Sequence, residues 1–246
     1  MLISAMVGID SRATMDIDTT LRNYPLNCES AEQIVRQIAD VEIDDKISFV
    51  IKKTEEIMED SEYQGVRLSL DAYLDKTRIP LKIDISTGDV ITPCEISFSY
   101  QLMFENRTIP LLAYPPETVL AEKLETILSR GEANTRLRDF YDVYILQRED
   151  FVVTPDALRY ALLATCRTRG HEDLLHTYAS ILDRVRQSDT MRTQWMKYQS
   201  DFDYAAGITW DTVLDTVETL CMKTLDDHAF GDELPQEESQ FEMHLL

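Results

Sequence analysis

Segments with the alternation of apolar and polar residues that is typical of β-strands recur in the first half of this chain, and no such segment appears beyond Thr154. Residues 65–73 and 79–86 show it most clearly, because every second side chain in them is apolar. Beyond Thr154, apolar residues recur only at helical spacing. The sequence therefore predicts an α+β fold, with a mixed α/β domain over 1–150, a helical bundle over 151–230 and an acidic, disordered tail over 231–246.

Local signals set the elements expected within this outline. Strands are predicted at 13–21, 47–51, 65–73, 79–86, 96–104 and 108–113. Helices are predicted to end at Gly8, to begin at a capping box that starts at Ser30, and to span 115–131 and 136–147. After Thr154, an N-cap followed by proline, three further helices are expected, marked by apolar residues within 158–166, 175–185 and 210–221.

The composition excludes several classes of protein. No apolar run approaches the roughly 20 residues that span a bilayer, and the apolar start lacks the basic segment of a signal peptide. The four cysteines lie far apart with no CxxC pair, so we expect reduced thiols in a cytoplasmic protein, without a zinc site or disulfide framework. The net charge of −21 argues against nucleic-acid binding by the whole surface, so any nucleic acid needs a local basic patch, or the substrate is small.

Two aspartates in the first predicted strand carry the strongest chemical signal. Asp16 and Asp18 are separated by one residue, so both side chains project from the same face of the strand. Like charges held together repel and lose hydration on burial, and a divalent cation is the usual reason to accept that cost. Mg²⁺ takes such oxygen ligands and keeps positions for phosphate oxygens and water. The alternative interpretation is a solvated strand end.

A third carboxylate and a basic helix extend this pattern. Asp84 lies on the polar side of a later strand, and three carboxylates from two neighbouring strands can hold two Mg²⁺ ions for phosphoryl or nucleotidyl transfer. Lys123, followed by Arg136, offers the positive charge that a triphosphate needs. The alternatives are a solvent-facing Asp84, a solvated Lys123, and an Asp139 that pairs only with neighbouring arginines.

Four short motifs, in this order, resemble those of the AbiEii/AbiGii toxin family, which are nucleotidyltransferase-fold toxins of bacterial toxin–antitoxin and abortive infection systems. The motifs are Arg-x-x-x-Asp-x-Asp (Arg12 to Asp18), Lys-Ile-Asp-Ile-Ser (Lys82 to Ser86), Ala-Glu-Lys-Leu (Ala121 to Leu124) and Arg-x-x-Asp-x-x-Asp (Arg136 to Asp142). Each motif alone is weak, whereas four in register over residues 1–150 are stronger evidence. The resemblance implies a polymerase-β-like nucleotidyltransferase fold, a small mixed sheet with flanking helices.

The resemblance also implies a role for each of these residues. Asp16, Asp18 and Asp84 would bind the metal, Mg²⁺ or Mn²⁺, and Asp84 is also a candidate base for the attacking hydroxyl. Lys123 would lie near the nucleotide phosphates, and Asp139 would be a further essential acid. The catalytic set that follows is Asp16, Asp18, Asp84, Lys123 and Asp139, with nucleotide contacts expected from Arg12, Thr14, Lys123 and Arg136.

The function that the resemblance implies is that of a toxin which transfers a nucleotide from an NTP to an acceptor, expected to be tRNA or another RNA. A cognate antitoxin would neutralise it. Two alternatives stay open: transfer to a small molecule or protein side chain, which suits the lack of basic runs, and a truncated, non-catalytic binding module. The second arises because the family's first helix and its triphosphate-binding glycine turn would fall before Met1 and are absent from the sequence.

Overall fold

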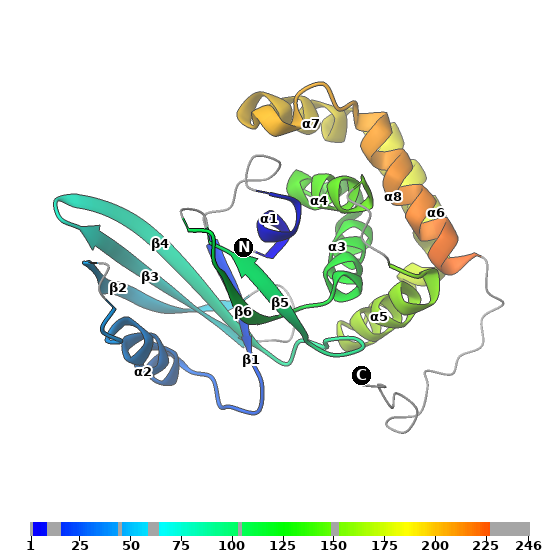
Figure 1. Cartoon of the computed structure of the whole chain (residues 1–246). Helices are drawn as coiled ribbons and strands as arrows, with labels where there is room; N and C mark the ends of the chain where they lie inside the picture. Colours follow the sequence, from blue (N-terminus) through cyan, green and yellow to red (C-terminus); the bar gives the residue numbers. More distant parts are fainter. Residues whose placement is uncertain are drawn as a thin grey trace.

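The computed structural model describes residues 2–8, 16–43, 46–58, 64–102, 105–148 and 153–226. Figure 1 shows a four-stranded sheet, a separate two-stranded hairpin and a layer of helices. This is the α+β arrangement that the alternating and helical patterns predict. The candidate residues Arg12 and Thr14 and the predicted tail 231–246 lie outside the described residues.

The main sheet has the strand order β1-β4-β3-β2. Its strands are β1 (Asp16–Leu21), β2 (Ile47–Met58), β3 (Gln64–Leu74) and β4 (Thr77–Thr87). β1 runs parallel to β4, and the other two neighbouring pairs are antiparallel. The sheet is therefore mixed, and β1, the strand with the aspartate pair, lies at one edge next to the strand with Asp84.

Helix α2 (Cys28–Ala39) covers the apolar face of this sheet. Its Ala31 and Val35 pack in one buried cluster with Leu68 of β3 and Ile85 of β4. The register of β1, β3 and β4 puts Asp18, Arg67 and Asp84 on the opposite face. Figure 1 shows this face turned toward the helical layer. A single helix on one face thus leaves the other face available for a cleft.

The N-cap of α2 is Asn27, one turn earlier than the predicted Ser30. The Asn27 side chain accepts a hydrogen bond from the Ser30 backbone N–H at 2.8 Å, and Ser30 Oγ accepts one from the Asn27 N–H at 3.0 Å. The capping box is therefore real, but Ser30 is its third helical residue. The prediction was wrong because Asn and Ser both cap helices, and the sequence did not show which of them comes first.

Strand β2 continues well beyond the predicted segment 47–51. The polar run Lys52–Glu56 has no apolar alternation, and the pairing of β2 with β3 shifts in register between Ile51 and Lys53. Because β2 is an edge strand, its charged side chains reach solvent. Because this half of β2 is irregular and exposed to solvent, its residues do not alternate between apolar and polar, and the sequence pattern does not predict a strand there.

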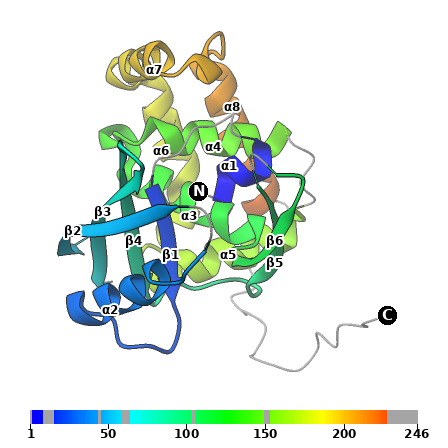
Figure 2. The same cartoon turned by 60° about the vertical axis from the view of Figure 1, so that its left-hand side comes forward.

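The second sheet is a hairpin of β5 (Ile96–Gln101) and β6 (Thr108–Ala113). β6 matches the predicted strand 108–113, and Pro110 fits there because each strand of a two-stranded sheet is an edge. β5 ends at Gln101, and residues 103–104 of the predicted strand lie outside the described part. Figure 2 shows the hairpin beside helix α1 (Leu2–Val7).

Local signals place the helices of the other layer. α1 ends at Gly8, which has a φ of 88°, and α3 (Pro116–Arg130) ends at Gly131, as predicted. Thr154 caps α5 (Pro155–Thr168) through its side chain, as its sequence predicts. The remaining helices are η1 (Gly131–Ala133), α4 (Leu137–Arg148), α6 (Leu174–Gln187), α7 (Asp189–Asp201), η2 (Asp203–Ala205) and α8 (Trp210–Leu225).

These helices share one large hydrophobic core that runs across residue 150 and includes α1. The apolar residues predicted to form a core stripe in 210–221 are buried in it. Helix α7 was not predicted: its buried residues Met191, Trp195 and Tyr198 form only a short stripe, and the rest of its sequence is polar apart from the exposed Met196. The domain boundary near residue 150 stays a prediction.

Among the described residues, no helix is long and apolar enough to cross a membrane. The four cysteines are free thiols, in agreement with the spacing argument. Cys166 and Cys221 are buried in the helical core, and this burial raises the pKa of each thiol to about 12.

Candidate active site

Three predicted carboxylates come together on the polar face of the main sheet. Asp18 of β1 pairs in register with Asp84 of β4, and side chains paired across neighbouring strands point to the same face. Asp16 lies two residues before Asp18 on that face and pairs with Lys82. Asp16 is half-buried and Asp18 is exposed. The sheet register thus places the three side chains together on one face of the sheet, in a group that we call the carboxylate row, although their catalytic and metal-binding roles stay predictions.

An arginine that the sequence analysis did not single out holds Asp84. Arg67 of β3 is the register partner of Asp84, and its Nε and Nη2 donate to Oδ1 and Oδ2 at 2.7 and 2.6 Å. This two-pronged contact with Asp84 raises the pKa of Arg67 above its ordinary value. The alternation of 65–73 placed Arg67 on the polar face, but only the register of β3 with β4 brings it to Asp84.

The chemistry of this face fits a hard divalent cation in part. Asp16 and Asp18 present carboxylate oxygens, the ligands that Mg²⁺ prefers, from one face of one strand. Both oxygens of Asp84 accept from Arg67, so Asp84 could join a metal site only by sharing or exchanging these contacts. Within the part of the chain that the structure describes, no three His, Cys, Asp or Glu side chains are already arranged as a metal site.

The second predicted group is an ion cluster between helices α3 and α4. Lys123 Nζ donates to Asp139 Oδ1 at 2.6 Å and lies 3.3 Å from Asp142 Oδ2. Arg136 Nε lies 3.1 Å from Asp139 Oδ2, so the local pairing considered for Asp139 is present as well. The two aspartate side chains are 2% and 0% exposed, and that of Lys123 is 19% exposed. Burial lowers the pKa of Lys123, but the two aspartates outweigh it, so the net pKa is raised.

Both groups face one large cleft of about 1070 Å³. Asp18 and Asp84 line it from the sheet, and Lys123 and Arg136 line it from the helical layer. Asp16 and Asp139 are not among its lining residues; Asp16 lies two residues before Asp18 on the same strand face, and Asp139 is hydrogen-bonded to Lys123. The cleft therefore joins the carboxylate face to the basic helix face that the motifs predicted separately.

A hydroxyl network that was missed from the sequence lies at the C-terminal ends of β1 and β4. Asp89 Oδ2 accepts from Thr20 Oγ1 at 2.7 Å and from the Tyr114 hydroxyl at 3.2 Å, and Thr20 Oγ1 lies 2.9 Å from Ser86 Oγ. Burial, followed by the charge of Asp89, raises the pKa of Tyr114. The phenol therefore stays protonated near neutral pH and can donate. The network fixes the loop after β4 against the strand that carries the aspartate pair.

A second missed cluster surrounds Glu125 at the helical side of the cleft. The Glu125 side chain is 3% exposed and pairs with Arg169, and one of its oxygens lies 2.6 Å from His171 Nδ1. Arg169 also lies 3.5 Å from Glu122. Burial lowers the pKa of Arg169, but Glu125 and Glu122 raise it more. No local signal could reveal this cluster, because Arg169 and His171 follow α5, far from α3 in the sequence.

Comparison with known proteins gives one family match. The family model described as nucleotidyl transferase AbiEii toxin, type IV TA system, matches residues 1–216. No curated protein matches the chain. Two solved structures are similar to it: a candidate nucleotidyltransferase from H. pylori (12% identity, 94% of this chain and 88% of that chain, TM-score 0.43), and JHP933 from Helicobacter pylori (13% identity, 92% and 84%, TM-score 0.42).

Proposed function

Because the chain belongs to the AbiEii family of nucleotidyl transferase toxins, we propose that its cleft transfers a nucleotidyl group from an NTP to an acceptor hydroxyl. One observation carries this proposal. The parallel pairing of β1 with β4 sets Asp18 beside Asp84, and Asp16 lies on the same face of the sheet. Asp18 and Asp84, from two neighbouring strands, both line one cleft. This is the arrangement expected of a polymerase-β-like nucleotidyltransferase site.

Asp16 and Asp18 would hold the divalent cation, Mg²⁺ or Mn²⁺, with Asp84 beside them. When bound, such an ion supplies neutralising charge to the triphosphate and to the leaving oxygen. Asp84 is the candidate acceptor of the proton from the attacking hydroxyl, and Arg67 orients its carboxylate. Because Arg67 contacts both oxygens of Asp84, the orientation of this carboxylate is fixed. A fixed carboxylate favours one position for the acceptor hydroxyl that donates to it.

Lys123 would contact the nucleotide phosphates from the helical side. An ammonium has three N–H donors. Among the described residues two aspartates account for two of them, because Asp139 and Asp142 lie at 2.6 and 3.3 Å. A third direction is left for a phosphate oxygen in the cleft that Lys123 lines. The buried aspartates thus act as positioning residues that hold the lysine, and Arg136 adds a second positive charge at the same place.

The proposed acceptor is RNA, with tRNA as the first candidate, and the proposed neutralising partner is a cognate antitoxin in the bacterial cytoplasm. The type IV toxin–antitoxin description of the family supports the antitoxin. The net charge of −21 favours, as the second candidate, transfer to a small molecule or a protein side chain. A small molecule or a protein side chain carries less negative charge than RNA, so the acidic protein would repel it less.

The test compares the parent chain with a variant that carries Asp16→Asn and Asp18→Asn. Each is incubated with Mg²⁺, labelled NTPs and total tRNA, and in parallel with a protein extract and a metabolite pool. Label should enter one acceptor class with the parent only, and chelation by EDTA should abolish it. The matched control is Asp183→Asn, which removes an exposed carboxylate of α6 away from the cleft. Equal transfer by the double variant, or no transfer by a folded parent to any acceptor, would refute the proposal.

A further inference from the structure

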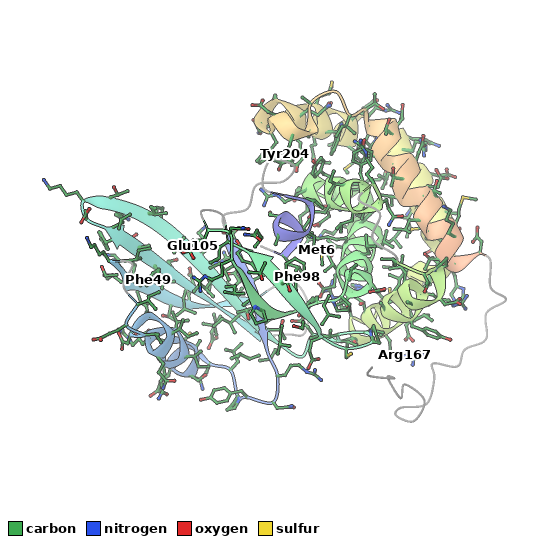
Figure 3. The ribbon with its side chains drawn as sticks, in the orientation of Figure 1. Met6, Phe49, Phe98, Glu105, Arg167 and Tyr204 are labelled. Atoms are coloured by element: carbon green, nitrogen blue, oxygen red, sulfur yellow. The ribbon has the colours of Figure 1, made fainter. Side chains whose placement is uncertain are left out.

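The hairpin β5–β6 contributes aromatic and apolar side chains to the cleft, whereas the main sheet and helix α3 contribute charged ones. Phe98 and Tyr100 of β5 are two residues apart, so their rings lie on one face of the hairpin. Their register partners on β6 are Leu111 and Ile109. Phe98, Tyr100 and Leu111 line the same cleft as Asp18 and Asp84. Figure 3 shows where Phe98 lies on the hairpin.

Both rings are partly exposed in the cleft, unlike the aromatic residues of the helical core. Phe98 and Tyr100 are half-buried, whereas Tyr141 and Trp195 are 1% exposed and pack among other rings. Part of each ring is therefore accessible from the cleft, and a flat ligand could cover that part without any rearrangement of the core. The hairpin therefore offers a preformed apolar surface in the same cleft as Asp18 and Asp84.

The charges of the cleft indicate which part of a nucleotide this wall would bind. Basic side chains that line the cleft are largely neutralised by carboxylates of the chain itself. The pairs are Arg22 with Glu95, Lys123 with Asp139 and Asp142, Arg136 with Asp139, and Arg169 with Glu122 and Glu125, whereas Arg130 makes no ion pair among the described residues. The net charge of −21 and these pairs reduce the attraction of the cleft for phosphates, which rests mainly on Lys123, Arg130 and Arg136. Binding of a nucleotide would therefore gain from contacts that do not depend on charge.

We propose that Phe98 and Tyr100 form a subsite that stacks a nucleobase in the cleft, on the hairpin side of the carboxylate row. Stacking on aromatic rings suits every base, because each base has a π-face, and it needs no positive charge. The cleft of about 1070 Å³ is at the upper end of the size of ligand sites, so it has room for a base beside a phosphate chain. This subsite deepens the proposed function and rests on it. The base belongs either to the NTP or to the acceptor.

The test measures binding without turnover. Equilibrium dialysis in Mg²⁺ determines the Kd of α,β-methylene nucleoside triphosphates, which cannot release pyrophosphate, and of inorganic tripolyphosphate, which has no base. The variant Phe98→Leu with Tyr100→Leu keeps apolar volume but removes both rings, and Phe98→Tyr with Tyr100→Phe keeps them. If the subsite holds the base of the NTP, the leucine variant should bind each nucleotide roughly 5- to 150-fold more weakly. Its affinity for tripolyphosphate should not change, and the ring-keeping variant should match the parent.

A second arm identifies the other source of the base. The Kd of the same variants for a short single-stranded RNA is measured by fluorescence anisotropy. A loss confined to this RNA assigns the subsite to the acceptor, and a loss confined to the nucleotides assigns it to the NTP. The matched control is Tyr160→Leu, which removes an aromatic ring of α5 that is 38% exposed and outside the cleft.

The inference is overturned if the leucine variant binds the nucleotides and the RNA within twofold of the parent. It is also overturned if tripolyphosphate binding falls to the same extent, because the loss would then not depend on a base. Circular dichroism and a thermal melt identify a variant that fails to fold, and the single substitutions Phe98→Leu and Tyr100→Leu then replace it. The binding measurements do not depend on turnover. Base-dependent binding without any nucleotidyl transfer would support the subsite and refute the proposed function. Nucleotidyl transfer by the parent, with equal binding by the leucine variant, would support the proposed function and refute the subsite.

Discussion

Replacement of Lys123 by methionine should destabilise the protein strongly, because it leaves two buried aspartates without their shared cation. The Asp139 and Asp142 side chains are 2% and 0% exposed, and Lys123 Nζ lies 2.6 and 3.3 Å from their oxygens. Loss of one partner from a buried ion cluster costs about 3–5 kcal/mol. Arg136 still contacts Asp139 at 3.1 Å, so we expect the lower end, about 3 kcal/mol. For a chain of this size that corresponds to a fall in Tm of roughly 6–12 °C.

Urea denaturation and a thermal melt, both followed by circular dichroism, measure this loss. The control Lys197→Met removes an exposed lysine of α7 and should change the free energy of unfolding by less than about 0.5 kcal/mol. Addition of Asp139→Asn and Asp142→Asn to the Lys123→Met variant should recover part of the loss, because the two buried negative charges that lost Lys123 are then removed. A loss below about 1 kcal/mol for Lys123→Met, or no recovery in the triple variant, would refute the reasoning.

The same cluster predicts a pH dependence, because the folded pKa of Lys123 is raised above its ordinary value of 10.5. Its contribution to stability is fully present below that value and is lost as pH rises through the folded pKa, so the parent's advantage over Lys123→Met should persist to about pH 10 and shrink beyond it. The buried Cys166 and Cys221 should resist a thiol reagent at pH 8 until the protein unfolds, whereas the exposed Cys94 should react at once. Leu162→Ala, at a site that is 0% exposed, should cost about 2–5 kcal/mol in a urea titration. Arg67→Met should make the Tm rise more steeply with added Mg²⁺ than it does in the parent, since one positive charge leaves the carboxylate face.

The parts of the fold that could be predicted from the sequence are those set by residues close together in the chain. Alternation defined the strands that contain Val66 and Ile83, and proline, threonine and glycine signals bounded α3 and α5. Helix α7 and the second half of β2 could not be predicted in this way. The second half of β2 has no apolar alternation, and α7 has only the short stripe Met191, Trp195 and Tyr198, so in both the local pattern is weak and the structure depends more on what packs beside them.

The candidate site, like the fold, could be predicted only where it depends on residues close together in the chain. Two carboxylates on one strand face follow from a spacing of two, so Asp16 and Asp18 could be proposed from the sequence alone. The order of the strands, in contrast, depends on contacts between distant segments, and it decides that Arg67 reaches Asp84. The pairing of Glu125 with residues after α5 has the same origin, since packing of α3 on α5 creates it.

The contact of Arg67 with Asp84 separates the enzyme hypothesis from that of a non-catalytic binding module. In an enzyme the arginine directs a carboxylate that still has to act, so its removal should strengthen metal binding while transfer slows. In a binding module Arg67 and Asp84 form only a cross-strand ion pair. Their side chains are 37% and 20% exposed, so the pair contributes little to the stability of the sheet. Arg67→Met would then lower the Tm slightly and leave its response to Mg²⁺ equal to that of the parent. A steeper response would place three mutually repelling carboxylates around a common cation, which a structural ion pair does not require.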